Sequence, residues 1–220
     1  MATMQESVLS YLDGCREEML RLWEIIVRLE TPSADAPAVS RLASHLDTYC
    51  DALGMETEKF QPQNAGLCLA ARTPAASLPP VLLLGHLDTV HPAGSFPGGP
   101  WRVEGDQVYG PGVHDCKGGL VIALYVIRAL QHAGYDRRQL KLVTVSDEET
   151  GHSLSRMAAV DFLESHARGC GAAFTFESGL PDGTLVTRRK GGGVIRLDVE
   201  GIASHCGTAP EKGASAIREA

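Results

Sequence analysis

The sequence has no long hydrophobic run and no extended basic stretch. No apolar segment approaches the roughly 18 residues that a membrane-spanning helix requires. The formal net charge is −7, which argues against nucleic acid or an anionic membrane as a partner. The first 20 residues also lack the basic and apolar regions of a secretory signal. These absences predict a protein that binds neither membranes nor nucleic acids.

The sequence also lacks the cysteine spacing of a disulfide framework or a zinc knuckle. Its six cysteines, at positions 15, 50, 68, 116, 170 and 206, form no CxxC pair. They predict reduced thiols in a cytoplasmic protein. With 220 residues, 44% of them hydrophobic, the chain can bury a substantial core and corresponds to one or two domains.

Strand-like and helix-like segments alternate along most of the chain. Helical periodicity covers residues 5–30, 36–53, 117–132 and 154–166. Strand-like runs lie near residues 55–61, 66–72, 81–87, 140–146 and 172–176. This order predicts an α/β fold with a mostly parallel, mixed sheet that carries helices on both faces.

The pattern changes at three consecutive glycines, residues 191–193. Residues 194–200 alternate apolar and polar side chains, which is typical of a strand with one solvated face, and a helix is expected to begin near residue 214. We therefore predict a larger domain over residues 1–189. Residues 190–220 would form the truncated start of a small α+β domain.

A histidine and an acid end the most apolar strand-like run. His86 and Asp88 follow residues 81–85, and side chains two apart on a strand share a face. An HxD pattern alone is typical of a capped turn. It also matches a metal-binding imidazole with a carboxylate behind it.

Four further acids stand where strands are expected to end. Asp115 lies in a glycine-rich loop, Glu148 and Glu149 follow residues 140–146, and Glu177 follows residues 172–176. Each acid alone could be a solvated helix cap. Gathered at the carboxyl edge of a sheet, they would repel one another unless a dication bound there, and nitrogen with oxygen ligands suits zinc.

Five motifs in this order resemble the co-catalytic di-zinc aminoacyl hydrolases. This family includes bacterial glutamate carboxypeptidase, acetylornithine deacetylase, succinyl-diaminopimelate desuccinylase, aminoacylase and peptidase T. The motifs are GHLDTV (85–90), GPGVHDCKGG (110–119), SDEETG (146–151), FESG (176–179) and GIASHCGTAPEKGASAI (201–217). The glutamate carboxypeptidase branch is the most similar, because WRVEGDQVYGPG (101–112) also fits it.

The resemblance implies a role for each motif residue. His86 and Glu177 would bind one zinc ion, Glu149 the second, and Asp115 would bridge both. Asp88 would orient His86. The expected cofactor is two Zn²⁺ per subunit, with Co²⁺ or Mn²⁺ as alternatives.

The implied reaction is hydrolysis of an amide bond next to a free carboxylate. A bridging hydroxide would attack, with Glu148 as general base, and His205 would reach into a partner subunit to stabilise the oxyanion, which implies a homodimer. The expected substrate is a small peptide, or an N-acyl amino acid if the protein is a deacylase.

Two features depart from the family pattern. The second zinc ion of the family needs a histidine from a later segment, and none of the eight histidines stands in that context. Position 215, usually an asparagine, is Ser215. These departures suggest the N-terminal part of a longer enzyme, with a truncated, non-catalytic form as the alternative.

Overall fold

The computed structural model describes residues 3–180, 182–188, 190–193 and 195–219. It divides the chain into two compact units, Met1–Leu180 and Pro181–Ala220. The first unit begins with the helices α1 (Met4–Gly14), α2 (Arg16–Arg28) and α3 (Ala36–Ala52). The single helix expected over residues 5–30 is divided at Cys15, directly after Gly14, because glycine is a poor helix former.

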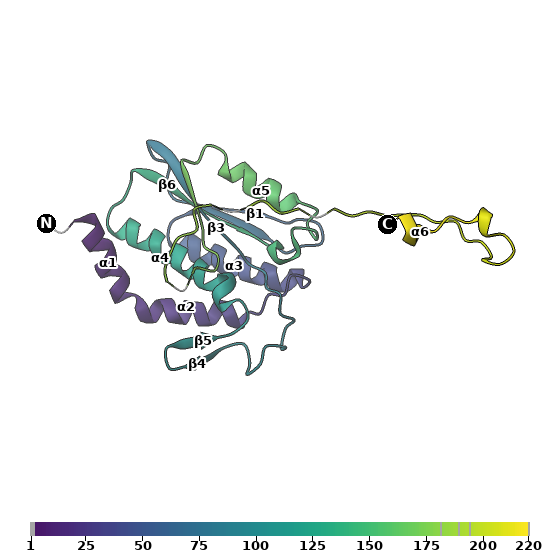
Figure 1. Ribbon diagram of the computed structural model, residues 1–220. Helices are drawn as coiled ribbons and strands as arrows, with labels where there is room; N and C mark the ends of the chain where they lie inside the picture. Colours follow the sequence, from purple (N-terminus) through teal and green to yellow (C-terminus); the bar gives the residue numbers. More distant parts are fainter. Residues whose placement is uncertain (1–2, 181, 189, 194, 220) are drawn as a thin grey trace. The chain divides into compact units, whose positions relative to one another are not determined.

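A five-stranded mixed sheet forms the centre of this unit (Figure 1). Its strands stand in the order β1-β2-β6-β3-β7. Their bounds are β1 Glu56–Phe60, β2 Cys68–Arg72, β3 Leu78–His86, β6 Arg138–Val145 and β7 Ala172–Thr175. β3 is parallel to both of its neighbours, β6 and β7, whereas β2 pairs antiparallel with β6 and β1 antiparallel with β2. The predicted mixed sheet is therefore confirmed.

Helices cover both faces of the sheet (Figure 1). On one face α2, α3 and α4 (Gly118–His132) bury a large apolar cluster against the strands, including Ile26, Leu42, Leu124 and Leu142. On the other face α5 (Ala158–Ala167) packs through Phe162 on a smaller cluster. Burial of these side chains contributes most of the driving force for folding.

The long segment between β3 and α4 is ordered by aromatic contacts. It contains the hairpin β4 (Arg102–Glu104) and β5 (Gln107–Tyr109), followed by η1 (Val113–Lys117), a kinked turn in which Asp115 and Cys116 have non-helical backbone dihedrals. Trp23 of α2 donates its indole N–H to the carbonyl of Val113 at 3.1 Å. Its ring packs edge-on against that of Trp101, with the ring centroids 5.5 Å apart. The loop that carries Asp115 is thereby fixed to α2.

The second unit contains little regular structure. Its described residues form a bridge between Ile202 and Ala214, the short turn η3 (Pro210–Lys212) and α6 (Ala216–Glu219). Of the strand predicted over residues 194–200, residue 194 lies outside the described part and residues 195–200 form no strand. A strand requires a hydrogen-bonded neighbour, and no described segment pairs with these residues. None of the described helices is long and apolar enough to cross a membrane.

Candidate metal centre

The carboxyl ends of three adjacent parallel strands bring most of the predicted site residues to one edge of the sheet. His86 ends β3, Glu148 and Glu149 begin the turn η2 (Glu148–Thr150) after β6, and Glu177 follows β7. Asp115 enters from η1. Its peptide bond to Cys116 is cis. Crevices at this edge are the usual ligand sites of open α/β sheets.

The His86 ring is buried and has a partner on each nitrogen. Nδ1 donates to the backbone carbonyl of Asp88 at 3.0 Å, so Nε2 is the atom that faces the acids. Asp115 Oδ1 lies 2.8 Å and Glu177 Oε2 3.5 Å from Nε2. Burial alone would lower the pKa of His86, but contacts with Asp88, Cys116 and Glu177 outweigh it and raise the pKa. The proton on Nε2 therefore stands between two carboxylates, where a dication could replace it.

The buried Asp88 carboxylate connects three separate segments. It accepts hydrogen bonds from Ser33 Oγ at 2.6 Å and from the backbone N–H groups of Glu148 and Glu149 at 3.1 and 3.2 Å. It also lies 3.4 Å from His86 Nδ1. Burial raises its pKa, but the hydrogen bonds from His86 and Ser33 prevail and lower it. Asp88 therefore remains ionised and holds both the histidine and the glutamate turn.

Two groups of side chains can supply a metal ion with three ligand atoms. In each group the ligand atoms lie within 4.8 Å of one another: His86, Asp115 and Glu149 in one, and His86, Cys116 and Glu177 in the other. His86 belongs to both. Nitrogen, carboxylate and thiolate donors are those that zinc prefers. The residues present therefore fit a zinc centre.

Glu148 and Glu149 lie among other acids. Burial raises the pKa of both side chains, and the charges of Asp88 and Asp115 raise it further, whereas His86 lowers it. Carboxylates collected in this way repel one another. A bound cation would relieve that repulsion.

A second buried carboxylate, Asp147, anchors the glutamate turn from its other side. It accepts the backbone N–H of Ser155 at 2.8 Å and contacts His152 Nδ1 at 3.2 Å. Thr150 Oγ1 donates to the Asp147 carbonyl at 3.0 Å. Sequence reasoning missed this anchor and that of Ser33. The only sequence signal for Ser33 is Thr-Pro-Ser at residues 31–33, a pattern that ends a helix and caps the next, and the SDEETG motif gives no sign of His152.

Comparison with protein-family models identifies residues 82–216 as matching "Peptidase family M20/M25/M40". The chain belongs to this peptidase family. The site edge and all five motifs, apart from the final residue Ile217 of the fifth, lie within the matched region. The predicted family resemblance is confirmed.

Two curated relatives show the range of the family. The chain is 30% identical to carboxypeptidase G2 of Pseudomonas sp. strain RS-16, over 92% of this chain and 49% of that protein. It is 34% identical to a putative succinyl-diaminopimelate desuccinylase of Mycobacterium tuberculosis, over 56% of this chain and 33% of that protein. The chain thus spans at most about half the length of these relatives.

A solved structure supports the fold. Human carnosine dipeptidase 1 superposes with a TM-score of 0.68 at 18% identity, over 80% of this chain and 41% of that one. The same α/β architecture is therefore shared at an identity too low to carry residue roles.

Glycine at position 119 is required by a close contact beside the candidate metal centre. A Cβ atom there would lie 2.0 Å from the carbonyl oxygen of Phe176, the residue before Glu177. α4 therefore approaches the backbone ahead of Glu177 closely at this position. Nearby, Lys117 is buried, its Nζ has no hydrogen-bond partner among the described residues, and burial lowers its pKa to about 7.

The remaining predicted site residue, His205, lies in the second unit and is exposed. Its role at the active site of another subunit stays a prediction.

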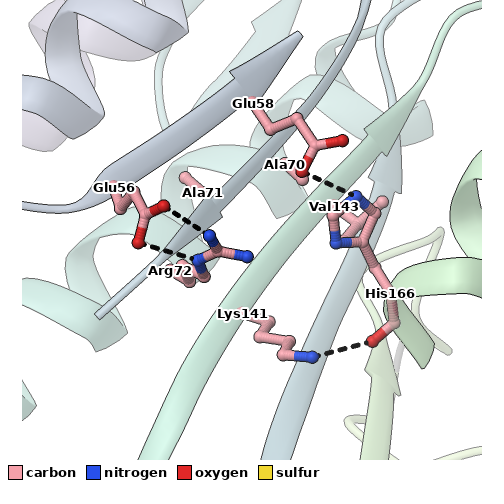
Figure 2. Close-up of a pocket in the computed structure, with 8 residues that line it drawn as sticks. All are labelled: Glu56, Glu58, Ala70, Ala71, Arg72, Lys141, Val143 and His166. Atoms are coloured by element: carbon pink, nitrogen blue, oxygen red, sulfur yellow. Dashed lines mark hydrogen bonds and ion pairs between the residues drawn. The ribbon is translucent and has the colours of Figure 1, made fainter. Parts of the chain in front are cut away.

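A polar pocket on the α5 side of the sheet shares no residue with the predicted site (Figure 2). There Arg72 pairs with Glu56, and Lys141 donates to the backbone carbonyl of His166. The pocket is lined by Glu56, Glu58, Ala70, Ala71, Arg72, Lys141, Val143 and His166.

Proposed function

We propose that the protein is a metal-dependent hydrolase that cleaves an amide or peptide bond next to a free carboxylate, as a glutamate-type carboxypeptidase or dipeptidase. The observation that carries this proposal is the convergence of His86, Asp115, Glu149 and Glu177 at one sheet edge, within the family-matched region. The likeness to carboxypeptidase G2 favours the carboxypeptidase branch. The likeness to a desuccinylase keeps N-acyl-amino-acid deacylation as the second candidate.

Two zinc ions are the proposed cofactor, with Co²⁺ or Mn²⁺ as functional substitutes. His86 and Glu177 would hold one ion, Glu149 the other, and Asp115 both. When bound, the ions supply Lewis acidity and lower the pKa of water. Asp88 keeps the His86 ring turned so that Nε2 faces the acids.

Glu148 is the proposed general base. It is exposed at the start of η2, and its backbone N–H is fixed by Asp88. In a turn of this type successive side chains point about 120° apart, because three residues complete one turn. Glu149 can therefore serve a metal ion while Glu148 takes a proton from water and delivers it to the leaving amine.

Replacing Glu148 tests this role. Glu148→Gln should lower turnover by roughly 10²–10⁴-fold, the usual contribution of general acid–base catalysis, and leave the zinc content per chain unchanged. Glu164→Gln on the exposed side of α5 is the matched control. Turnover close to that of the unmodified protein in Glu148→Gln would refute the role. A panel of C-terminal glutamyl peptides and N-acetyl and N-succinyl amino acids would separate the two substrate classes.

A non-catalytic form is the rival proposal, and a specific observation favours it. Among the described residues both possible ligand groups depend on one histidine, His86. Zinc content and turnover of the 220-residue chain discriminate between the proposals. Two ions with turnover support the enzyme, whereas one ion without turnover on the whole panel supports the rival.

We also propose a homodimer in the cytoplasm. The resemblance of His205 to a histidine that acts in a partner subunit supports the dimer. The six cysteines, all of them free in the structure, support a reducing compartment. Light scattering coupled to size-exclusion chromatography tests the dimer directly.

A further inference from the structure

The ring of His205 is held by the backbone that follows it. The N–H groups of Gly207 and Thr208 both donate to His205 Nδ1, at 3.1 and 3.2 Å. A backbone N–H can only donate a hydrogen bond, so Nδ1 must act as an acceptor. In a neutral imidazole the hydrogen then resides on Nε2.

The segment that presents this histidine is closed by its own hydrogen bonds. Ile202 and Ala214 exchange two backbone hydrogen bonds, at 2.8 and 2.9 Å, and Ala209 N–H donates to the His205 carbonyl at 3.1 Å. The segment is tightly folded at Gly213, where a Cβ atom would lie 2.2 Å from Ser204 Oγ. All of these contacts lie within residues 202–214. The ring orientation is therefore a property of this segment alone.

We propose that the turn at residues 206–208 presets His205 as the neutral Nε2–H tautomer. The Nε2–H of His205 is thereby available as a hydrogen-bond donor toward a carbonyl or carboxylate oxygen of the substrate. The side chain is exposed, so its Nε2 edge is accessible to a ligand. The role of His205 toward a substrate oxygen rests on the proposed function, whereas the assignment of its tautomer does not.

Nuclear magnetic resonance of the 220-residue chain labelled with ¹⁵N tests the tautomer without any turnover. At pH 8, above the ordinary pKa of histidine, we expect His205 Nδ1 to show the shift of an unprotonated nitrogen and Nε2 that of a protonated one. We also expect scalar couplings through the hydrogen bonds from the amide nitrogens of Gly207 and Thr208 to Nδ1. His205→Ala identifies the signals, and a short histidine peptide in the same buffer is the reference for a ring that exchanges freely between tautomers.

Removal of one donor supplies a second measurement. Thr208→Pro deletes its N–H and should move the His205 nitrogen shifts toward those of the histidine peptide. Absence of both couplings in the unmodified chain, with His205 shifts equal to those of the peptide, would overturn the proposal even if Thr208→Pro disturbs the turn. A confirmed tautomer with full turnover in His205→Ala, which has no side-chain donor, would instead refute the oxyanion role and leave the tautomer standing.

Discussion

The Asp88 carboxylate accepts the backbone N–H of Glu149 at 3.2 Å, although 61 residues separate them in the sequence. The same carboxylate contacts His86. The histidine at the end of β3 and the glutamate turn after β6 therefore form one hydrogen-bonded unit. A change at Asp88 should therefore disturb both His86 and Glu149 of the candidate metal centre.

Asp88→Asn should weaken zinc binding by about 10–100-fold, the usual effect of losing a partner that orients a metal ligand. The amide retains one acceptor oxygen, but its NH₂ group would face a backbone N–H donor or Ser33. Competition with a chromophoric chelator measures the affinity. Asp106→Asn, in the exposed turn of the β4–β5 hairpin, is the control. Equal zinc affinity in both variants would contradict the role of Asp88.

Ser33→Ala should lower the free energy of unfolding by about 1.5–3 kcal/mol, because it removes a buried hydrogen bond to a charged group. The bond to Asp88 measures 2.6 Å. Urea denaturation measures the change. Ser95→Ala removes an exposed bond of 2.6 Å to the Pro92 carbonyl and should change the stability much less. Similar losses of unfolding free energy in the two variants would show that the Ser33–Asp88 hydrogen bond contributes no more to stability than an exposed one.

Gly119→Ala should destabilise the protein by about 1–3 kcal/mol and weaken zinc binding, because the added methyl group displaces the backbone next to Glu177. The atom in its way is the Phe176 carbonyl oxygen, which belongs to the backbone and cannot rotate aside. Gly14→Ala is the contrasting control, because nothing lies within 4 Å of its Cβ. In a helix this change should stabilise by about 0.5–1 kcal/mol. An unchanged zinc affinity in Gly119→Ala would argue against the coupling to Glu177.

His166 should make the protein less stable as the pH falls below neutrality. Burial lowers its pKa; Glu58 opposes this shift, and Lys141 and Arg72 add to it (Figure 2). The unfolded chain therefore binds more protons between the lowered folded pKa and the ordinary value of about 6.5, so stability falls as the pH decreases through this window.

His166→Gln removes this titration. Denaturation between about pH 5 and 7.5, across the ordinary histidine pKa, should show a smaller loss of stability on acidification in His166→Gln than in the unmodified chain. A pH dependence that is identical in the two proteins would show that His166 does not contribute.

Local sequence patterns were sufficient for the sheet and for the placement of His86, Glu148 and Glu177 at one of its edges. Apolar runs that end in His86, Glu148 and Glu177 indicated parallel strands whose carboxyl ends meet, and the structure places these residues at one edge. Short segments are enough for these predictions, because a buried strand requires a run of apolar residues and the residue that ends the strand follows directly in the sequence. The division of the first helix at Cys15 was not foreseen, since the apolar face continues across Gly14.

Residue patterns alone predicted the family resemblance, the mixed α/β sheet and which acids accompany His86. Only the tertiary structure revealed that Ser33 and Asp88 meet, that Asp147 and His152 brace the glutamate turn, and that Gly119 touches the Phe176 backbone. Two of these contacts join residues more than fifty positions apart, and the third depends on the course of an irregular turn. Periodicity reports which face of an element is buried, whereas a hydrogen bond depends on distances of a few tenths of an ångström that only the packed chain fixes.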